Sequence, residues 1–73
     1  MALHSTAYRV AGVNSGHCQA RISTALRALD TVRTVRMEIS TGVLTVTTET
    51  EPDDGLVSET VEDAGYDFLG RAD

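Results

Sequence analysis

Lysine and tryptophan are absent from this sequence of 73 residues, which has one proline, one cysteine and three aromatic residues. Because Cys18 is the sole cysteine, the sequence excludes an internal disulfide, and without a CxxC pair it excludes a zinc ribbon or zinc finger. Its apolar runs are only a few residues long, which predicts that no segment spans a membrane. The start, Met1–His4, has neither a basic segment nor an apolar run, so we expect no secretory signal and a cytoplasmic protein.

The charged residues divide the chain into a basic half and an acidic half. Residues 1–37 carry five arginines against one aspartate, a net charge of +4, whereas residues 38–73 carry ten acids against one arginine, a net charge of −9. The total of −5 opposes attraction to phosphates, so we expect no binding of nucleic acid. The acidic half is expected to be a solvated face. The length and a hydrophobic content of 41% predict a single small globular domain over 1–73.

Alternation of apolar and polar residues predicts the strands of this domain. They are expected over residues 7–11, 34–39 and 43–48, with a short last strand starting around Tyr66 and Phe68. Ser40-Thr41-Gly42 has the composition of a hairpin turn between the second and third strands. Val35, Met37 and Ile39 share one face and are expected to be buried. Tyr8 and Phe68 follow the same periodicity and are expected in the core.

Two segments have helical spacing instead. The apolar stripe of the first helix, which should end at Asp30-Thr31, consists of Cys18, Ile22, Ala25, Leu26 and Leu29. The stripe of the second helix, which Asp53 or Asp54 could cap and Gly65 could end, consists of Val57, Thr60, Val61 and Ala64. The resulting order, β-α-β-β-α-β, predicts an α+β fold, the ferredoxin-like sandwich with two helices on one face of a four-stranded antiparallel sheet.

The residues that could carry chemistry lie between the first strand and the first helix, in Gly12-Val13-Asn14-Ser15-Gly16-His17-Cys18. This loop resembles the metal-binding loop of heavy-metal-associated domains, the family of small copper chaperones and of the amino-terminal modules of copper ATPases. The family pattern is Gly-Met-x-Cys-x-x-Cys. Gly12 and Cys18 match its glycine and second cysteine, whereas Val13 replaces the methionine and Ser15 replaces the first cysteine.

The resemblance extends along the chain, because Ser40-Thr41-Gly42 is similar to the family's hairpin and Ala64-Gly65-Tyr66 to the loop after its second helix. In bacterial members the tyrosine of that loop lies near the metal. The resemblance implies a protein that binds and transfers Cu(I) and has no enzymatic activity. It also implies, as a partner, a metal-transporting ATPase or another metal-binding protein.

Each candidate residue has a functional and a structural interpretation. Cys18 is a metal-facing thiol in the first turn of the helix or a small buried apolar residue. Ser15 is a cap of that helix or a metal ligand. His17 is an exposed loop residue or a second ligand, and His4 lies outside any motif. Tyr66 is expected to pack in the core or shield the site.

One sulfur is half of a Cu(I) site, because soft Cu(I) accepts as few as two ligands. The second donor could be Cys18 of another molecule in a metal-bridged homodimer, a cysteine of a partner domain, an exogenous thiol, or His17. Ag(I) and Hg(II) also favour sulfur, whereas Zn(II) prefers about four ligands. His17 and Cys18 do not suggest a catalytic pair, because neighbouring helical residues point about 100° apart.

Two alternatives to a metal carrier remain open. One is a ferredoxin-like interaction module that binds no metal and uses Arg21 and Arg27 to dock an acidic partner. The other is a Cys-to-Ser variant of an ordinary two-thiol copper domain, in which Ser15 marks a ligand position.

Overall fold

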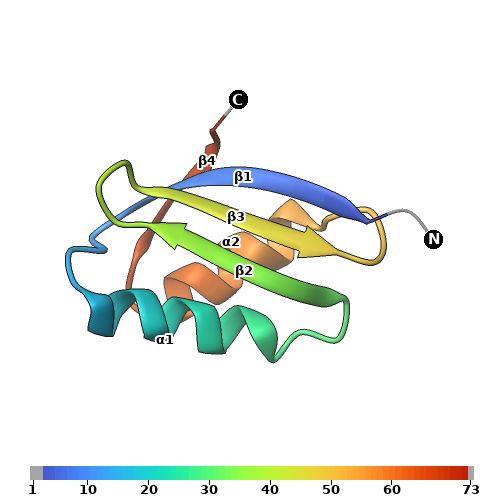
Figure 1. Ribbon diagram of the computed structural model, residues 1–73, viewed down its shortest axis with the longest axis horizontal. Helices are drawn as coiled ribbons and strands as arrows, with labels where there is room; N and C mark the ends of the chain where they lie inside the picture. Colours follow the sequence, from blue (N-terminus) through green and yellow to red (C-terminus); the bar gives the residue numbers. More distant parts are fainter. Residues whose placement is uncertain (1–2, 73) are drawn as a thin grey trace.

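Four strands and two helices follow one another in the order β-α-β-β-α-β over residues 3–72, the part of the chain that the computed structural model describes (Figure 1). Their bounds are β1 (His4–Ala11), α1 (Gly16–Arg27), β2 (Val32–Glu38), β3 (Val43–Thr48), α2 (Asp54–Asp63) and β4 (Asp67–Arg71). The strands pair antiparallel in the order β2-β3-β1-β4. Both helices cover the same face of this sheet (Figure 1). The predicted ferredoxin-like α+β fold is therefore confirmed.

The core lies between the sheet and the two helices. On the central strands, every second side chain points into it, because successive strand residues face opposite sides of a sheet. Tyr8 and Val10 of β1 and Leu44 and Val46 of β3 are at most 4% exposed. From the helices, the buried side chains are Ile22, Leu26, Val57 and Val61. Phe68 of β4 is partly buried, and its ring centre lies 5.5 Å from that of Tyr8.

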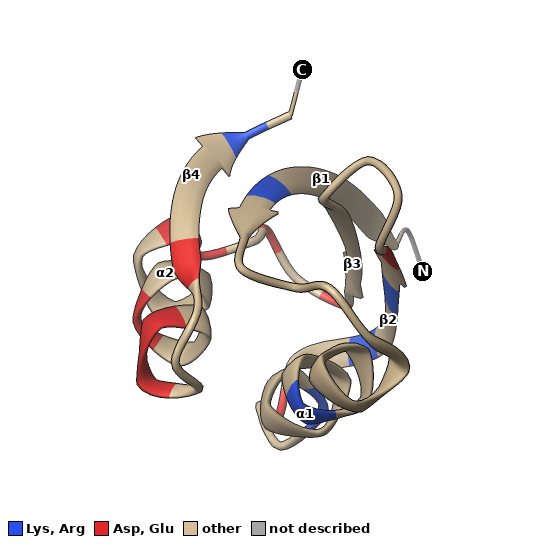
Figure 2. Ribbon diagram, turned by 90° about the vertical axis from the view of Figure 1, so that its left-hand side faces the viewer, with Lys and Arg blue, Asp and Glu red and all other residues tan. Residues whose placement is uncertain are grey.

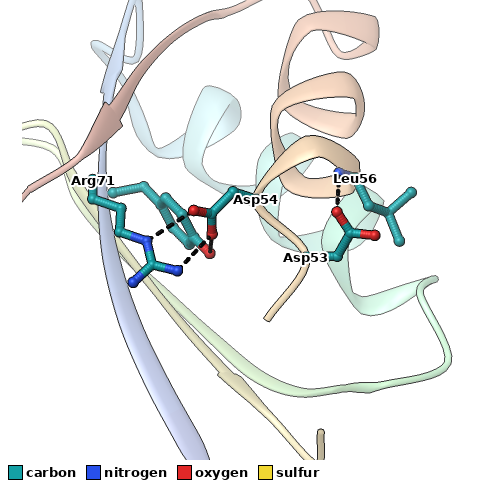
Figure 3. A network of polar contacts seen from close by, with 5 residues as sticks. Asp53, Asp54, Leu56 and Arg71 are labelled. Atoms are coloured by element: carbon teal, nitrogen blue, oxygen red, sulfur yellow. Dashed lines mark hydrogen bonds and ion pairs between the residues drawn. The ribbon is translucent and has the colours of Figure 1, made fainter. Parts of the chain in front are cut away.

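Local signals place the ends of α2. The Asp53 carboxylate accepts a hydrogen bond from the Leu56 N–H at 3.1 Å, which identifies Asp53 as the N-cap (Figure 3). Gly65 follows the helix with φ of 98°, a left-handed conformation that glycine adopts at little cost. The predicted stop at Gly65 is thus confirmed. Neither helix of residues 3–72 is long and apolar enough to cross a membrane.

Several boundaries differ from the sequence prediction. β1 starts at His4, because residues 4–6 pair with the end of β3. β2 ends at Glu38, where the Gly42 N–H donates to the Glu38 carbonyl at 2.9 Å and closes the turn. The expectation that Ile39 is buried on this strand is wrong, because Ile39 already belongs to the turn and is 36% exposed.

Asp54 links three elements that are distant in sequence (Figure 3). The Tyr8 hydroxyl of β1 donates to Asp54 Oδ1 at 2.7 Å, and Arg71 of β4 donates to both carboxylate oxygens, at 2.8 Å and 3.1 Å. Hydrogen bonding by Arg71, and then by Tyr8, lowers the pKa of Asp54. Burial, followed by the hydrogen bond to Asp54, raises the pKa of Tyr8 to about 12. This cluster joins the edge strand β4 and the start of α2 to the centre of the sheet.

The uneven charge of the sequence reappears in space, because the two helices carry opposite charges (Figure 2). The charged side chains of α1 are Arg21 and Arg27, whereas α2 carries Asp54, Glu59, Glu62 and Asp63. The helical layer therefore presents a basic and an acidic half side by side.

Candidate metal site at the start of α1

The loop between β1 and α1 is held against the core at two points. Val13 is 8% exposed and belongs to the hydrophobic core. Gly12 has φ of 94°, in the left-handed region, and a side chain there would lie 3.5 Å from the ring of Tyr66. These contacts fix the path of the chain, so that Ser15 begins α1 and Cys18 falls in its first turn.

Ser15 is the N-cap of α1, as the capping interpretation predicted. Its backbone is extended, and its hydroxyl oxygen accepts a hydrogen bond from the Cys18 N–H at 3.3 Å. The helix starts at Gly16, two residues earlier than the first residue of the apolar stripe. The role of Ser15 as a metal ligand stays a prediction.

Cys18 is a free thiol at the edge of the core and is partly exposed. Its Sγ donates to Asn14 Oδ1 at 3.8 Å. Hydrogen bonding by the Ser15 hydroxyl, and then by the Tyr66 hydroxyl, lowers the pKa of the thiol, and the charge of Arg21 acts in the same direction. The first turn of a helix also favours an anion. The surroundings of Cys18 thus stabilise the thiolate, the form that binds metals.

Tyr66 is 8% exposed, so the expectation of core packing is confirmed. Its hydroxyl reaches Cys18, and this hydrogen bond is the main reason why the pKa of Tyr66 is raised. Tyr66 lies in the turn before β4 instead of in the strand itself. The turn after α2 and the loop before α1 therefore meet at Cys18.

The two histidines lie in different places. His17 is exposed in the first turn of α1, next to Cys18, and forms no hydrogen bond or ion pair with residues 3–72. Its role as a second ligand stays a prediction. His4 lies at the start of β1, at the opposite end of this strand from the loop. Among the residues that the structure describes, no three His, Cys, Asp or Glu side chains gather as a metal cluster.

Sequence reasoning missed two neighbours of Cys18. Asn14, four residues before it, accepts from the thiol, and Arg21, three residues after it, adds a positive charge. Helical spacing could have indicated Arg21, because residues three apart lie on the same side of a helix.

A groove runs beside this site along α1. It has a volume of about 450 Å³ and is lined by His17, Ala20, Arg21, Thr24 and Ala25 of α1 and by Ala64 at the end of α2. Three of these six side chains are alanines, so the walls of the groove are short.

Comparisons with known proteins agree with this arrangement. The family model of the heavy-metal-associated domain matches residues 7–67. The structure is similar to the CopZ metallochaperone, with a TM-score of 0.86 and 24% identity over 90% of this chain and 100% of that chain. It is also similar to oxidized MerP from Ralstonia metallidurans, with a TM-score of 0.82 and 20% identity over 94% of this chain and 97% of that one. A third similar structure is the yeast copper transporter domain CCC2A, solved in apo and Cu(I)-loaded states. Its TM-score is 0.83, with 29% identity over 90% of this chain and 92% of that domain. A search of curated protein sequences finds no match.

Proposed function

This chain belongs to the heavy-metal-associated domain family, and from this premise we propose that it binds Cu(I) through Cys18 and passes the ion to a partner protein. The observation that carries the proposal is the partly exposed Cys18 thiol, whose pKa is lowered by hydrogen bonds from Ser15 and Tyr66. Its position, in the first turn after the β1–α1 loop, is that of the second cysteine of the family pattern.

Cu(I) fits this donor better than other common ions do. A thiolate is a soft ligand, and Cu(I) is satisfied by as few as two such ligands. Zn(II) prefers about four ligands in a tetrahedral arrangement. Ag(I) and Hg(II) share the preference for sulfur and are expected to compete with Cu(I) for Cys18.

The second donor in this proposal comes from outside the chain. The hydroxyl oxygen of Ser15 already accepts the hydrogen bond that caps α1, and it is a hard neutral donor. The external sulfur would come from a partner domain, such as that of a metal-transporting ATPase, from Cys18 of a second copy, or from a small thiol. Because the two sulfur ligands do not belong to one loop, replacing one of them by a ligand of the acceptor is enough to start the release of Cu(I).

A carrier of this kind works in a reducing compartment such as the cytoplasm, where a lone thiol stays reduced. It performs no covalent catalysis. Arg21 and Arg27 of α1 are exposed and would face an acidic partner surface during transfer. The same charges support the second candidate, an interaction module that docks a partner without metal.

The test is a Cu(I) titration under reducing conditions against a chromophoric competitor. The native protein and Cys18→Ala are compared, with Ser23→Ala, a change five residues further along α1, as the matched control. The proposal predicts that the native protein and Ser23→Ala take up Cu(I) and that Cys18→Ala does not. Equal uptake by all three proteins would contradict it. No uptake by any protein, together with docking of a partner, would favour the interaction module.

A further inference from the structure

The helical layer carries exposed charges of both signs that are not joined in ion pairs. On α1 they are Arg21 and Arg27, which we call the basic face, and on α2 they are Glu59, Glu62 and Asp63, which we call the acidic face. None of these five side chains forms an ion pair or a side-chain hydrogen bond in the part of the chain that the structure describes. Their charges are therefore open to a second molecule.

The two faces lie next to each other on the outside of the domain. Helices α1 and α2 run side by side over one face of the sheet (Figure 2). Their buried side chains, among them Ile22 and Val61, pack in the core, so the charged residues of each helix point away from the sheet. A molecule that approaches the helical layer therefore meets positive charge on one helix and negative charge on the other.

The groove along α1 leaves room for a helix of a second molecule. Its walls are short, because Ala20, Ala25 and Ala64 line it together with Arg21 of the basic face. Short side chains let two helices approach closely, since the distance between packed helices depends on the side chains at the contact. On α2, Leu56 is 39% exposed and adds apolar surface to the layer.

We propose that two copies of this chain associate through their helical layers, with the basic face of each copy on the acidic face of the other. A two-fold axis that runs between α1 and α2, parallel to the layer, places each α1 over α2 of the second copy, so the same contact is made twice. An arrangement with α1 over α1 would bring like charges together. Charge complementarity thus favours a second copy as the partner and selects its orientation.

This association needs no metal and no contact with Cys18, so it goes beyond the proposed copper function. The helices have 12 and 10 residues and are about 18 Å and about 15 Å long, which gives a contact smaller than the usual value of about 800 Å² per partner. We therefore expect a weak, reversible dimer. It should form at about 0.01 M salt, where charges act over about 30 Å, and dissociate at about 1 M, where they act over about 3 Å.

The test is sedimentation equilibrium at low and high salt, with every protein in a Cys18→Ala background. Without this cysteine, neither a disulfide nor a metal bound by Cys18 can join two copies. One protein keeps the charges of both faces. The matched control carries Arg9→Glu and Arg36→Glu, on the opposite face of the sheet. Both arginines are exposed and alternate along their strands with buried residues that face the helices.

Two further proteins reverse the charge of one face each. The first carries Arg21→Glu and Arg27→Glu, the same change in net charge as in the control, and has acidic residues on both helices. The second carries Glu59→Arg and Glu62→Arg and has arginines on both helices. Arginine and glutamate are both good helix formers, so the exchanges should preserve the helices, and circular dichroism checks that each variant is folded.

We expect the protein with native charges and the control to dimerise at low salt with similar dissociation constants. Losing one exposed ion pair weakens binding by up to about five-fold. Because the two-fold axis repeats every contact, each face variant alone should dimerise at least about ten-fold more weakly. An equimolar mixture of the two face variants should dimerise again, since the acidic α1 of one then meets the arginines on α2 of the other.

Three results would overturn the proposed dimer. The first is a protein with native charges that stays monomeric at low salt up to about 1 mM. The second is a control that is weakened as much as the variant of the basic face. The third is a mixture of folded face variants that stays monomeric. Each of them leaves Cu(I) uptake through Cys18 untouched, which the titration of the native protein against Cys18→Ala tests separately.

Discussion

Replacing Tyr8 by phenylalanine removes one buried hydroxyl and tests whether the Asp54 cluster holds the fold together. Tyr8 is 0% exposed, and its hydroxyl donates to Asp54 at 2.7 Å. Hydrogen bonds to charged groups contribute about 1.5–3 kcal/mol. Because Asp54 keeps both bonds from Arg71, we expect a loss near the lower end, about 1.5 kcal/mol. For a domain of this size, that lowers the melting temperature by about 6–12 °C.

The loss of stability caused by Tyr8→Phe should also depend on pH, and the pKa of Tyr8 gives the direction. The pKa of Tyr8 is raised to about 12 in the folded protein, whereas the pKa of an ordinary tyrosine is about 10. The folded state therefore holds this proton to higher pH than the unfolded state does, and stability falls as pH rises above the unfolded value. The difference in unfolding free energy between the native protein and Tyr8→Phe should have its largest value below about pH 10. It should decrease as the pH rises toward about 12.

Urea denaturation followed by circular dichroism measures this difference at each pH. The urea dependence should be the same for both proteins, because the surface that unfolding exposes hardly changes. A difference below about 0.5 kcal/mol at neutral pH would refute the reasoning, since it would mean that water replaces the bond at no cost. A difference that grows between about pH 10 and pH 12 would refute the direction of the linkage.

Three further predictions concern other parts of the molecule. Ser15→Ala should lower the unfolding free energy by about 1 kcal/mol through loss of the N-cap, and raise the pKa of Cys18, which Ser15 lowers. An unchanged pKa in the ultraviolet absorbance of the thiolate would contradict this. Gly12→Ala should cost about 1–2 kcal/mol in thermal denaturation, because φ is 94° there. Leu26→Ala, at 0% exposure, should cost about 2–5 kcal/mol. The exposed Leu56→Ala should cost less than about 0.5 kcal/mol, and equal losses at both sites would be inconsistent with the described core.

The order of elements could be predicted from the sequence because most segments carry strong local signals. Residues 43–48 were placed correctly, since β-branched residues alternate there with a turn before them. The error at Ile39 has a physical cause. Its apolar side chain continues the alternation of β2, but the bond from Gly42 N–H to the Glu38 carbonyl ends the strand one residue earlier. The alternation of apolar and polar residues carries no information about this hydrogen bond, so it could not show where the strand ends.

The candidate site could likewise be predicted only in part. The placement of Cys18 and Ser15 at the start of α1 could be predicted, because the two residues are close in sequence and the loop has a characteristic spacing. Their roles as metal ligands stay predictions. The groove could not be predicted, because Ala64, just after α2, and Arg21 of α1 line the same space only after the two helices pack on the sheet. The link from Tyr8 to Asp54 is equally remote in sequence and also depends on the finished fold.

The most direct test of the central claim is X-ray absorption at the copper edge of the protein loaded with Cu(I). The claim predicts a two-coordinate ion bound by sulfur, and loss of the protein-bound copper in Cys18→Ala. A spectrum of the loaded native protein with only nitrogen and oxygen neighbours would contradict it, as would an unchanged spectrum when Cys18 is replaced.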